Sequence, residues 1–317
     1  PPAIGPIAPQ PITPVEEAPW RAERPGAKAR KFTQTRALAI KNATLLLGTG
    51  KRLERGTIVL DKGLIAAVGG AETPIPDGAD VIDGAGMFVT PGLIDTHSHM
   101  GVYAYPASVA TDDGNEMVDP VTAHVRSEDG FWPQDPALMR AVMGGTTTIQ
   151  VLPGSANLIG GRATTLKLRD GESVRDLHFD GALDGLKMAC GENPKRTYGG
   201  KERAPRTRMG NIAGQRAAFL NAKKLIASWD EYRQGEETRR TKRAKQVAKH
   251  QQKKLERAQR GEWCDAHGDP DPCGAWRAEW RKEPLEEPEK ESSPPPPARD
   301  LGQETLAGAV EGKILVH

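Results

Sequence analysis

A run of apolar and β-branched residues that ends in two histidines constrains the fold more than any other feature of this sequence. Residues 88–95 read FVTPGLID, broken only by Pro91 and Gly92, and His97 and His99 follow one residue apart. In an extended strand, residues i and i+2 point to the same side. The two imidazoles can therefore enter one space, an arrangement that first-row transition metals favour. The alternative is that both histidines merely cap the end of a strand.

Strand-like and helix-like runs alternate through much of the chain after these histidines. The strand-like runs are 146–152, 184–190 and 313–317, and the helix-like runs are 136–143, about 209–229 and 301–310. Between the first two of these strands, the sequence Gly160-Gly161-Arg162 indicates a turn that presents a cation. From residue 37 to residue 89 the sequence predicts short strands and turns. Alternating strands and helices favour a parallel barrel or an open parallel sheet.

Composition narrows the class of protein. The 317 residues carry a formal net charge of +2, which gives no general case for binding nucleic acid. No apolar run approaches the roughly 18 residues that a membrane span needs, so we expect none. Residues 1–36 are rich in proline and predict an extended tether. Such a stretch fits an exported protein, periplasmic or extracellular, although a cytoplasmic linker has the same composition.

Residues 236–300 differ in composition from the rest of the chain and predict a charged helical insertion. Residues 239–260 are strongly basic and predict a helix, whereas residues 283–291 are acidic. A solvated insertion whose two charge blocks balance each other explains this pattern. The alternative is an arm that binds a polyanion or docks a partner.

The insertion also contains two of the three cysteines. Cys264 and Cys273 bracket a turn-rich loop that a disulfide can staple, which leaves Cys190 unpaired. Two free thiols are one alternative. A zinc site that uses both cysteines and His267 is another, although it lacks an obvious fourth ligand.

The run around the two histidines resembles the first barrel strand of the amidohydrolase superfamily, the metal-dependent hydrolases that include imidazolonepropionase, dihydropyrimidinase and dihydroorotase. The sequence around Lys187, GLKMACG, is similar to a strand of the imidazolonepropionase and prolidase-related branch. The resemblance implies an α/β fold that holds the N-terminal part of a TIM-like (β/α)8 barrel. The implied divisions are a Pro-rich tether at 1–36, part of a small β-sandwich at 37–90, the first part of the barrel at 91–235, the charged helical insertion at 236–300, and a barrel helix and strand at 301–317.

The resemblance also implies a metal centre of two divalent ions, with zinc expected, where a metal-activated water cleaves an amide, peptide or cyclic-amide C–N bond. The implied ligands are His97, His99, His317 and a carboxylated Lys187 that bridges the ions. Glu192 is the rival for the bridge, since some relatives use a glutamate. The alternatives are a Lys187 paired with Glu192 or Asp184, and a His317 without a role.

We expect polar groups near the strand ends to shape the pocket of a small-molecule or peptide substrate. The candidates are Tyr103, Asn157, Arg162 and Arg208, of which the arginines can equally be structural. Family members continue past a strand like 313–317 with βα units that carry the general-base aspartate. We therefore expect that aspartate, and the C-terminal half of the enzyme, on a second chain within a higher oligomer. A truncated sequence is the plainer explanation, and a non-catalytic docking or scaffold subunit is the alternative function.

Overall fold

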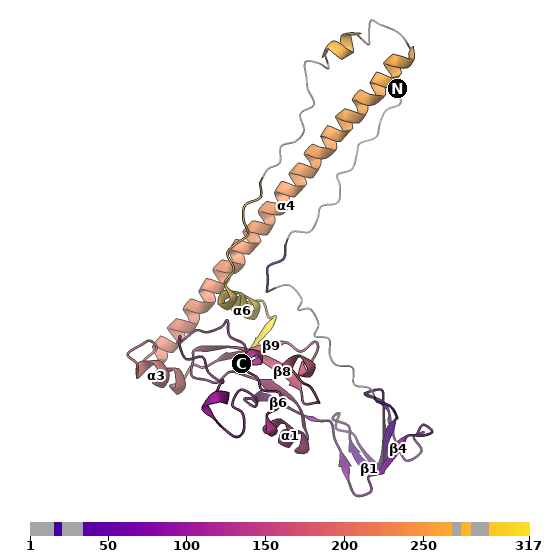
Figure 1. The fold of residues 1–317 in the computed structure, drawn as a ribbon, viewed down its shortest axis with the longest axis vertical. Helices are drawn as coiled ribbons and strands as arrows, with labels where there is room; N and C mark the ends of the chain where they lie inside the picture. Colours follow the sequence, from indigo (N-terminus) through magenta and orange to yellow (C-terminus); the bar gives the residue numbers. More distant parts are fainter. Residues whose placement is uncertain (1–15, 21–33, 268–273, 280–291) are drawn as a thin grey trace. The chain divides into compact units, whose positions relative to one another are not determined.

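The computed structural model describes residues 16–20, 34–267, 274–279 and 292–317 (Figure 1). These residues form two compact units. The strand unit contains residues 34–220 and 301–317, and the helical unit contains the described residues between 16 and 20 and between 221 and 300. All strands of the described chain belong to the strand unit. The candidate metal ligands and substrate-binding residues, which lie between His97 and Arg208 and at His317, belong to it as well.

The first sheet of the strand unit has five strands. They are β1 (Leu38–Leu46), β2 (Arg52–Asp61), β3 (Leu64–Gly69), β4 (Asp80–Asp83) and β5 (Phe88–Val89). The order is β3-β2-β1-β4, and β5 also pairs with β1. Lys62 and Gly63 close the β2–β3 hairpin with positive φ angles of 52° and 74°, as a two-residue turn between twisted strands requires. The sandwich part that the sequence predicted is therefore a single sheet here.

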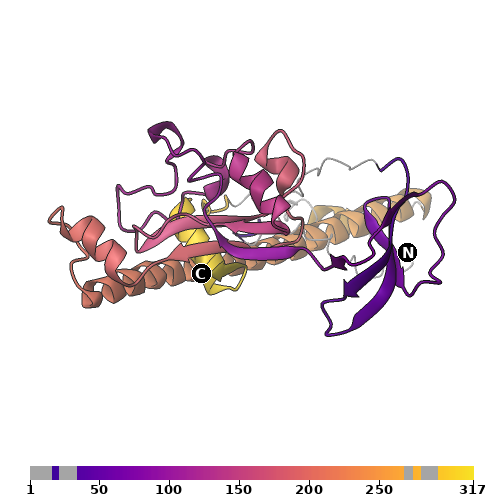
Figure 2. The same ribbon diagram turned by 90° about the horizontal axis from the view of Figure 1, so that it is seen from below.

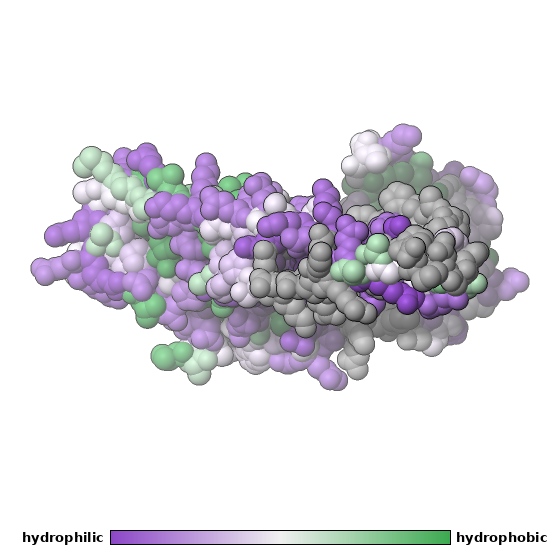
Figure 3. Space-filling model, turned by 90° about the horizontal axis from the view of Figure 1, so that it is seen from above, coloured by the Kyte–Doolittle hydropathy of each residue, from purple (hydrophilic) through white to green (hydrophobic). Residues whose placement is uncertain are grey.

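This first sheet leaves large apolar side chains uncovered. Seven of them are exposed: Leu46, Leu64, Ile65, Val68, Val81, Ile82 and Phe88. Figure 3, which colours one face of the molecule by hydropathy, shows hydrophobic residues at the surface among hydrophilic ones. Most of these side chains lie on β3, β4 and β5, toward the two edges of the sheet, where a further strand can pair.

The second sheet carries the candidate site, and the order of its strands is β10-β9-β8-β7-β6. Figure 2 shows strands of this sheet side by side. The strands are β6 (Leu93–Ser98), β7 (Thr146–Val151), β8 (Ile159–Lys167), β9 (Asp184–Met188) and β10 (Ile314–Val316). β6 pairs parallel with β7, and β9 with β10, whereas β8 is antiparallel to both of its neighbours. The fold is α/β, as the sequence predicted.

Strand β8 corrects one sequence-based expectation, because Gly160, Gly161 and Arg162 lie inside a strand and not in a turn. Glycine is needed at this place in the strand for a steric reason. A Cβ on Gly161 would lie 2.5 Å from Cγ2 of Val125 and 2.6 Å from its carbonyl oxygen, and the φ of Gly161 is +123°. Glycine within a strand commonly marks such a close approach of a second backbone.

Short helices surround this sheet. They are α1 (Pro136–Met143), α2 (Val174–Leu177), α3 (Glu192–Gly199) and α6 (Leu301–Val310), with 3₁₀ turns at Val109–Thr111 and Ser127–Asp129. α1 packs against β7, and α6 packs against β10. A buried apolar cluster joins α1 and α2 to β7 and β8; it contains Val102, Phe131, Leu138, Ile149, Val151, Leu166 and Leu177. The predicted helices at 136–143 and 301–310 are both present.

Helix α4 (Arg208–His267) is continuous, although the sequence predicted separate helices at 209–229 and 239–260. Its residues from 221 onward belong to the helical unit. There, residues 16–20 of the predicted tether pack on α4, where the Trp20 and Trp229 rings meet edge to face with centroids 6.0 Å apart. Glu17 forms an ion pair with Arg233. None of the described helices is both long and apolar enough to cross a membrane.

The disulfide predicted for Cys264 and Cys273 involves a residue outside the described part of the chain. Cys264 is buried on α4, whereas Cys273 lies between the described residues 267 and 274. The acidic run at 283–291 also lies outside the described residues. The pairing and the charge balance therefore stay predictions. Cys190, which the sequence analysis left unpaired, is a free cysteine and is exposed.

Candidate functional site

Four nitrogen-bearing side chains converge at one edge of the second sheet. Nε2 of His97 lies 3.1 Å from Nζ of Lys187, and Nδ1 of His97 lies 3.0 Å from Nε2 of His317. The ring of His97 also meets those of His99 and His317 edge to face, with centroids 5.2 Å and 4.7 Å apart. Residues that are 90 and 220 positions apart in the sequence thus share one space.

Strand direction explains this convergence. His97 lies near the carboxyl end of β6, Lys187 near the carboxyl end of β9, and His317 directly after β10. Carboxyl ends of strands with the same direction meet at one edge of the sheet, where α/β enzymes place their sites. Two main-chain hydrogen bonds secure the last strand, from the His317 amide to the Leu186 carbonyl and from the Met188 amide to the His317 carbonyl.

Electrostatics favour neutral nitrogens in this cluster. Burial, followed by the nearby Lys187, lowers the pKa of His97 and the pKa of His317. Burial also lowers the pKa of Lys187, whose residue is only 5% exposed. Neutral imidazoles bind metal ions, and an uncharged amine is the form of lysine that reacts as a nucleophile.

A main-chain carbonyl orients His99. Its Nδ1 lies 2.8 Å from the carbonyl oxygen of Leu152, at the end of β7. An Nδ1–H that donates to this carbonyl leaves the lone pair on Nε2, which is how metal-binding histidines are commonly fixed. The Leu152 amide in turn donates to the carbonyl of Ser98, so β6 and β7 hold the histidine from both sides.

The donor types fit a metal ion, but the side chains as they stand contact one another. No group of three or more His, Cys, Asp or Glu side chains in the described part of the chain has the arrangement of a metal site. Both ring nitrogens of His97 are engaged, one with His317 and one with Lys187. Three imidazoles and an amine supply nitrogen donors. Two divalent ions also need an anionic group between them, and Lys187 would have to supply it.

Glu192, the rival bridging ligand, is not in this cluster. It is the first residue of α3, its side chain is 79% exposed, and it pairs with Arg196 at 3.5 Å. Asp184, the other proposed partner of Lys187, pairs with Arg162. The contact that the structure gives Lys187 is with His97.

Tyr103 lies beside the cluster. Its ring meets that of His99 edge to face with centroids 5.7 Å apart. Its hydroxyl accepts a hydrogen bond from Nδ2 of Asn115, a residue that the sequence analysis did not single out. Burial raises the pKa of Tyr103, with Asp112 adding to the effect, so the phenol keeps its proton. A protonated phenol at this place can donate a hydrogen bond.

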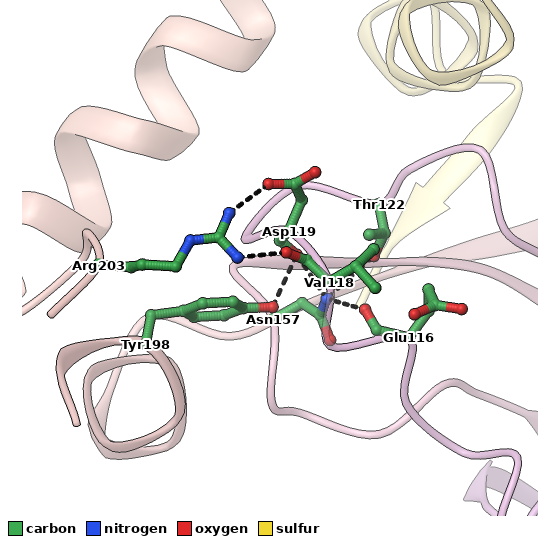
Figure 4. Close-up of polar contacts among 7 residues, drawn as sticks. All are labelled: Glu116, Val118, Asp119, Thr122, Asn157, Tyr198 and Arg203. Atoms are coloured by element: carbon green, nitrogen blue, oxygen red, sulfur yellow. Dashed lines mark hydrogen bonds and ion pairs between the residues drawn. The ribbon is translucent and has the colours of Figure 1, made fainter. Parts of the chain in front are cut away.

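Asn157 holds a loop (Figure 4). Its side chain is buried, and Nδ2 lies 2.6 Å from the Glu116 carbonyl, 2.8 Å from the Asp119 carbonyl and 3.1 Å from Oγ1 of Thr122. The same loop is held from α3 and the residues after it: the Tyr198 hydroxyl donates to the Asp119 carbonyl, and Arg203 binds the Val118 carbonyl and the Asp119 carboxylate.

The two arginines proposed for the substrate pocket lie elsewhere on the strand unit. Arg162 pairs with Asp184 and stands in register with Leu186, so its side chain is on the face of β8 and β9 opposite to Lys187. Arg208 is exposed at the first residue of α4. The structure therefore brings neither arginine to the histidines.

One buried carboxylate near the site went unnoticed in the sequence analysis. Asp135 caps α1 and accepts hydrogen bonds from the amides of Gly101, Tyr105 and Ala137. An aspartate directly before Pro136 is a recognisable helix start. The bonds to residues 101 and 105 leave no such local signal, because their partners are 30 or more positions away.

Comparison with known proteins finds amidohydrolases that resemble this chain. The chain is 37% identical over 196 residues to the amidohydrolase tasK of Hapsidospora irregularis, a match that covers 58% of this chain and 20% of that protein. The crystal structure of an amidohydrolase from Thermotoga maritima superposes with a TM-score of 0.61 and 30% identity, covering 87% of this chain and 56% of that one. These similarities support the amidohydrolase superfamily, of which the chain resembles an N-terminal portion. An enamidase of Eubacterium barkeri, another relative, is 54% identical over 55 residues, 16% of this chain and 14% of the enamidase.

The chain covers only part of the length of these similar proteins. The chain spans about half the length of the Thermotoga amidohydrolase and a fifth of the Hapsidospora one. No protein-family model matches the chain. The amidohydrolase fold is therefore shared over the described strand unit, whereas the activity of a whole enzyme is a matter for proposal.

Proposed function

We propose that this chain forms part of a metal-dependent hydrolase that cleaves an amide, peptide or cyclic-amide C–N bond. The observation that carries the proposal is the convergence of His97, His99, His317 and Lys187 at the carboxyl edge of the second sheet. Kinship to amidohydrolases, one of them an enamidase, supports the choice of bond.

The residues that would hold the metal are the three histidines and Lys187. The neutral amine of Lys187 adds carbon dioxide and releases one proton, which gives a carbamate with two oxygens. The low exposure of Lys187 and the lowering of its pKa by burial support this modification. A bound divalent ion, with zinc expected, would supply an activated water and polarise the substrate carbonyl.

The remaining side chains act on geometry and hydrogen bonding. An Nδ1–H of His99 that donates to the Leu152 carbonyl would leave Nε2 as the nitrogen that binds a metal ion. Tyr103 offers a protonated hydroxyl next to His99, where it would bind a polar group of the substrate. Asn157 would shape the pocket through the 116–122 loop that it holds.

The proposed enzyme is completed by the C-terminal half as a second chain, with a higher oligomer expected. Support comes from apolar side chains at both edges of the second sheet: Leu93 and Ile94 on β6, and Leu315 and Val316 on β10, are each more than half exposed. Edge strands with such side chains normally pair with further strands. Intact-mass analysis of the native protein would show a second polypeptide, and one species at the mass of this chain alone would refute the two-chain arrangement.

Metal analysis of the assembled protein tests the proposed function. We expect about two equivalents of zinc or a similar ion per site, lost in His97→Ala and retained in His124→Ala, an exposed histidine of the 112–126 segment. Lys187→Ala should also lose metal, while Lys187→Glu, which supplies a carboxylate, should recover part of it. Absence of metal from the assembled parent protein would favour the non-catalytic docking subunit.

A further inference from the structure

We propose that Asp135 is a positioning residue that holds Tyr103 against His99 at the candidate metal centre. Its importance for catalysis rests on the proposed function, because Tyr103 affects a reaction only if the histidine cluster performs one. The placement of Tyr103 is a property of the chain itself. It can be measured whether or not the protein is a hydrolase.

Asp135 is a buried carboxylate with three main-chain donors. Its residue is 2% exposed. Oδ2 accepts from the Gly101 amide at 2.9 Å, and Oδ1 accepts from the Tyr105 amide at 3.1 Å and from the Ala137 amide at 2.9 Å. Hydrogen bonds to an ionised acceptor are stronger than neutral ones, so these contacts hold the backbone firmly.

Two of these bonds enclose the turn that follows the metal-site histidines. Gly101 and Tyr105 flank the segment 102–104, and the carboxylate ties both ends of this segment to the start of α1. A third bond, from the Trp132 amide to the Gly101 carbonyl at 2.9 Å, secures the first end again. A Cβ on Gly101 would lie 2.3 Å from the Phe131 ring, which shows how closely the turn approaches the 131–135 segment.

The side chains of this turn alternate between the core and the site. Val102 and Ala104 are buried, and Val102 belongs to the apolar cluster under the sheet. Tyr103 and Tyr105 are exposed, and the Tyr103 ring contacts His99. Because residue 103 stands midway between the two held amides, a displacement of either end moves its phenol relative to His99.

Asp135 also caps α1, and this second role has to be separated from the first. The cap bond from the Ala137 amide shares Oδ1 with the bond from Tyr105, whereas the bond from Gly101 is the one that Oδ2 accepts. Serine is as good a helix cap as aspartate. Its single, shorter hydroxyl replaces the cap acceptor but not the second oxygen. Asp135→Ser therefore keeps the helix start and loses the acceptor of the Gly101 amide, which loosens the Gly101 end of the turn.

Fluorine NMR of the full chain labelled with 3-fluorotyrosine tests the proposal. The sequence has four tyrosines, so four resonances are expected, and Tyr→Phe variants assign them. In Asp135→Ser the Tyr103 and Tyr105 resonances should shift or broaden, while those of Tyr198 and Tyr232 stay in place. The unfolding midpoint should remain closer to the parent value than that of Asp135→Ala.

Asp176 provides a matched control carboxylate. Its Oδ2 also accepts three hydrogen bonds, from the amides of Glu172 and Ser173 and from the Ser173 hydroxyl, at the start of α2. Asp176→Ser should leave all four fluorine resonances unchanged. Asp135→Asn, which keeps the shape of the side chain and one acceptor oxygen, should move the Tyr103 resonance less than Asp135→Ser does.

The proposal is overturned if the Tyr103 resonance of Asp135→Ser matches that of the parent protein. It is equally overturned if all four resonances of Asp135→Asn and Asp135→Ser change together, because Asp135 would then serve only general stability. Metal loss or inactivity of the parent protein would refute the proposed hydrolase function and leave the fluorine result intact.

Discussion

We expect Asn157→Ala to destabilise the strand unit more than any ordinary surface substitution. The amide nitrogen of Asn157 serves two main-chain carbonyls and one hydroxyl of the 116–122 loop (Figure 4). Alanine removes this donor and leaves space that a methyl group does not fill. The loop then loses its link to the segment between β7 and β8.

The expected loss of stability depends on which hydrogen bonds each acceptor keeps in Asn157→Ala. The Asp119 carbonyl retains the Tyr198 hydroxyl at 2.7 Å, and Thr122 retains its bond to the Ile159 carbonyl, whereas the Glu116 carbonyl loses its donor. Glu116 is exposed, so its carbonyl can turn to water, and each of the three lost bonds costs about 0.5–1.5 kcal/mol. The sum is about 1.5–4.5 kcal/mol. For a unit of this size, that lowers the unfolding midpoint by about 3–18 °C.

Thermal unfolding followed by circular dichroism measures this loss, with Asn193→Ala as the matched control. Asn193 lies on α3 and donates one hydrogen bond, to the Ser155 hydroxyl at 2.6 Å. Its replacement should cost about 0.5–1.5 kcal/mol. Equal midpoints for the two variants would refute the assignment of Asn157 as the residue that holds the loop. Asn157→Asp, which exchanges the donor for an acceptor, should be at least as damaging as Asn157→Ala.

Two further predictions concern the strand unit. Gly161→Ala should destabilise the protein by about 2–5 kcal/mol in denaturant titrations, because of its positive φ and the contact with Val125. The control is Gly261→Ala, at a helical site with open space, which should be neutral or stabilising. Equal effects of the two substitutions would contradict the steric explanation. The Asn42 amide, followed by the Ala85 amide, lowers the pKa of Asp83, so the stabilisation exists at neutral pH and is lost as pH falls through that lowered pKa. Asn42→Gly should raise the Asp83 pKa in a carboxyl NMR titration, and an unchanged value would exclude the amide as the cause.

Local patterns in the sequence predicted the elements that position the candidate site. The His97 strand, the Lys187 strand and the final strand are all present, and strand direction alone then brings their ends together. Strand β8 was missed because Gly160 and Gly161 have the composition of a turn, and only the backbone around Val125 reveals why glycine is needed there.

The roles of Asn157 and Asp135 could not be read from the sequence for a related reason. Their partners lie between 30 and 41 positions away, apart from the local cap at Ala137, and a hydrogen bond to a main-chain amide or carbonyl places no requirement on the partner's side chain. Asn157 was therefore interpreted as a substrate ligand from its place at a strand end. Binding of substrate by Tyr103 and of metal by the four nitrogen donors stays a prediction.

The uncovered apolar residues of the first sheet have a consequence for how this chain is made. Ile65 and Val68 are exposed on β3 and Phe88 is exposed on β5, toward opposite edges of the sheet, and each edge can pair with a similar strand. During synthesis, two such surfaces on neighbouring ribosomes can meet before the natural cover arrives, and aggregation then competes with folding at high expression. The yield of soluble protein should therefore depend on how soon another segment packs over these side chains. It should improve when that segment is produced together with this chain.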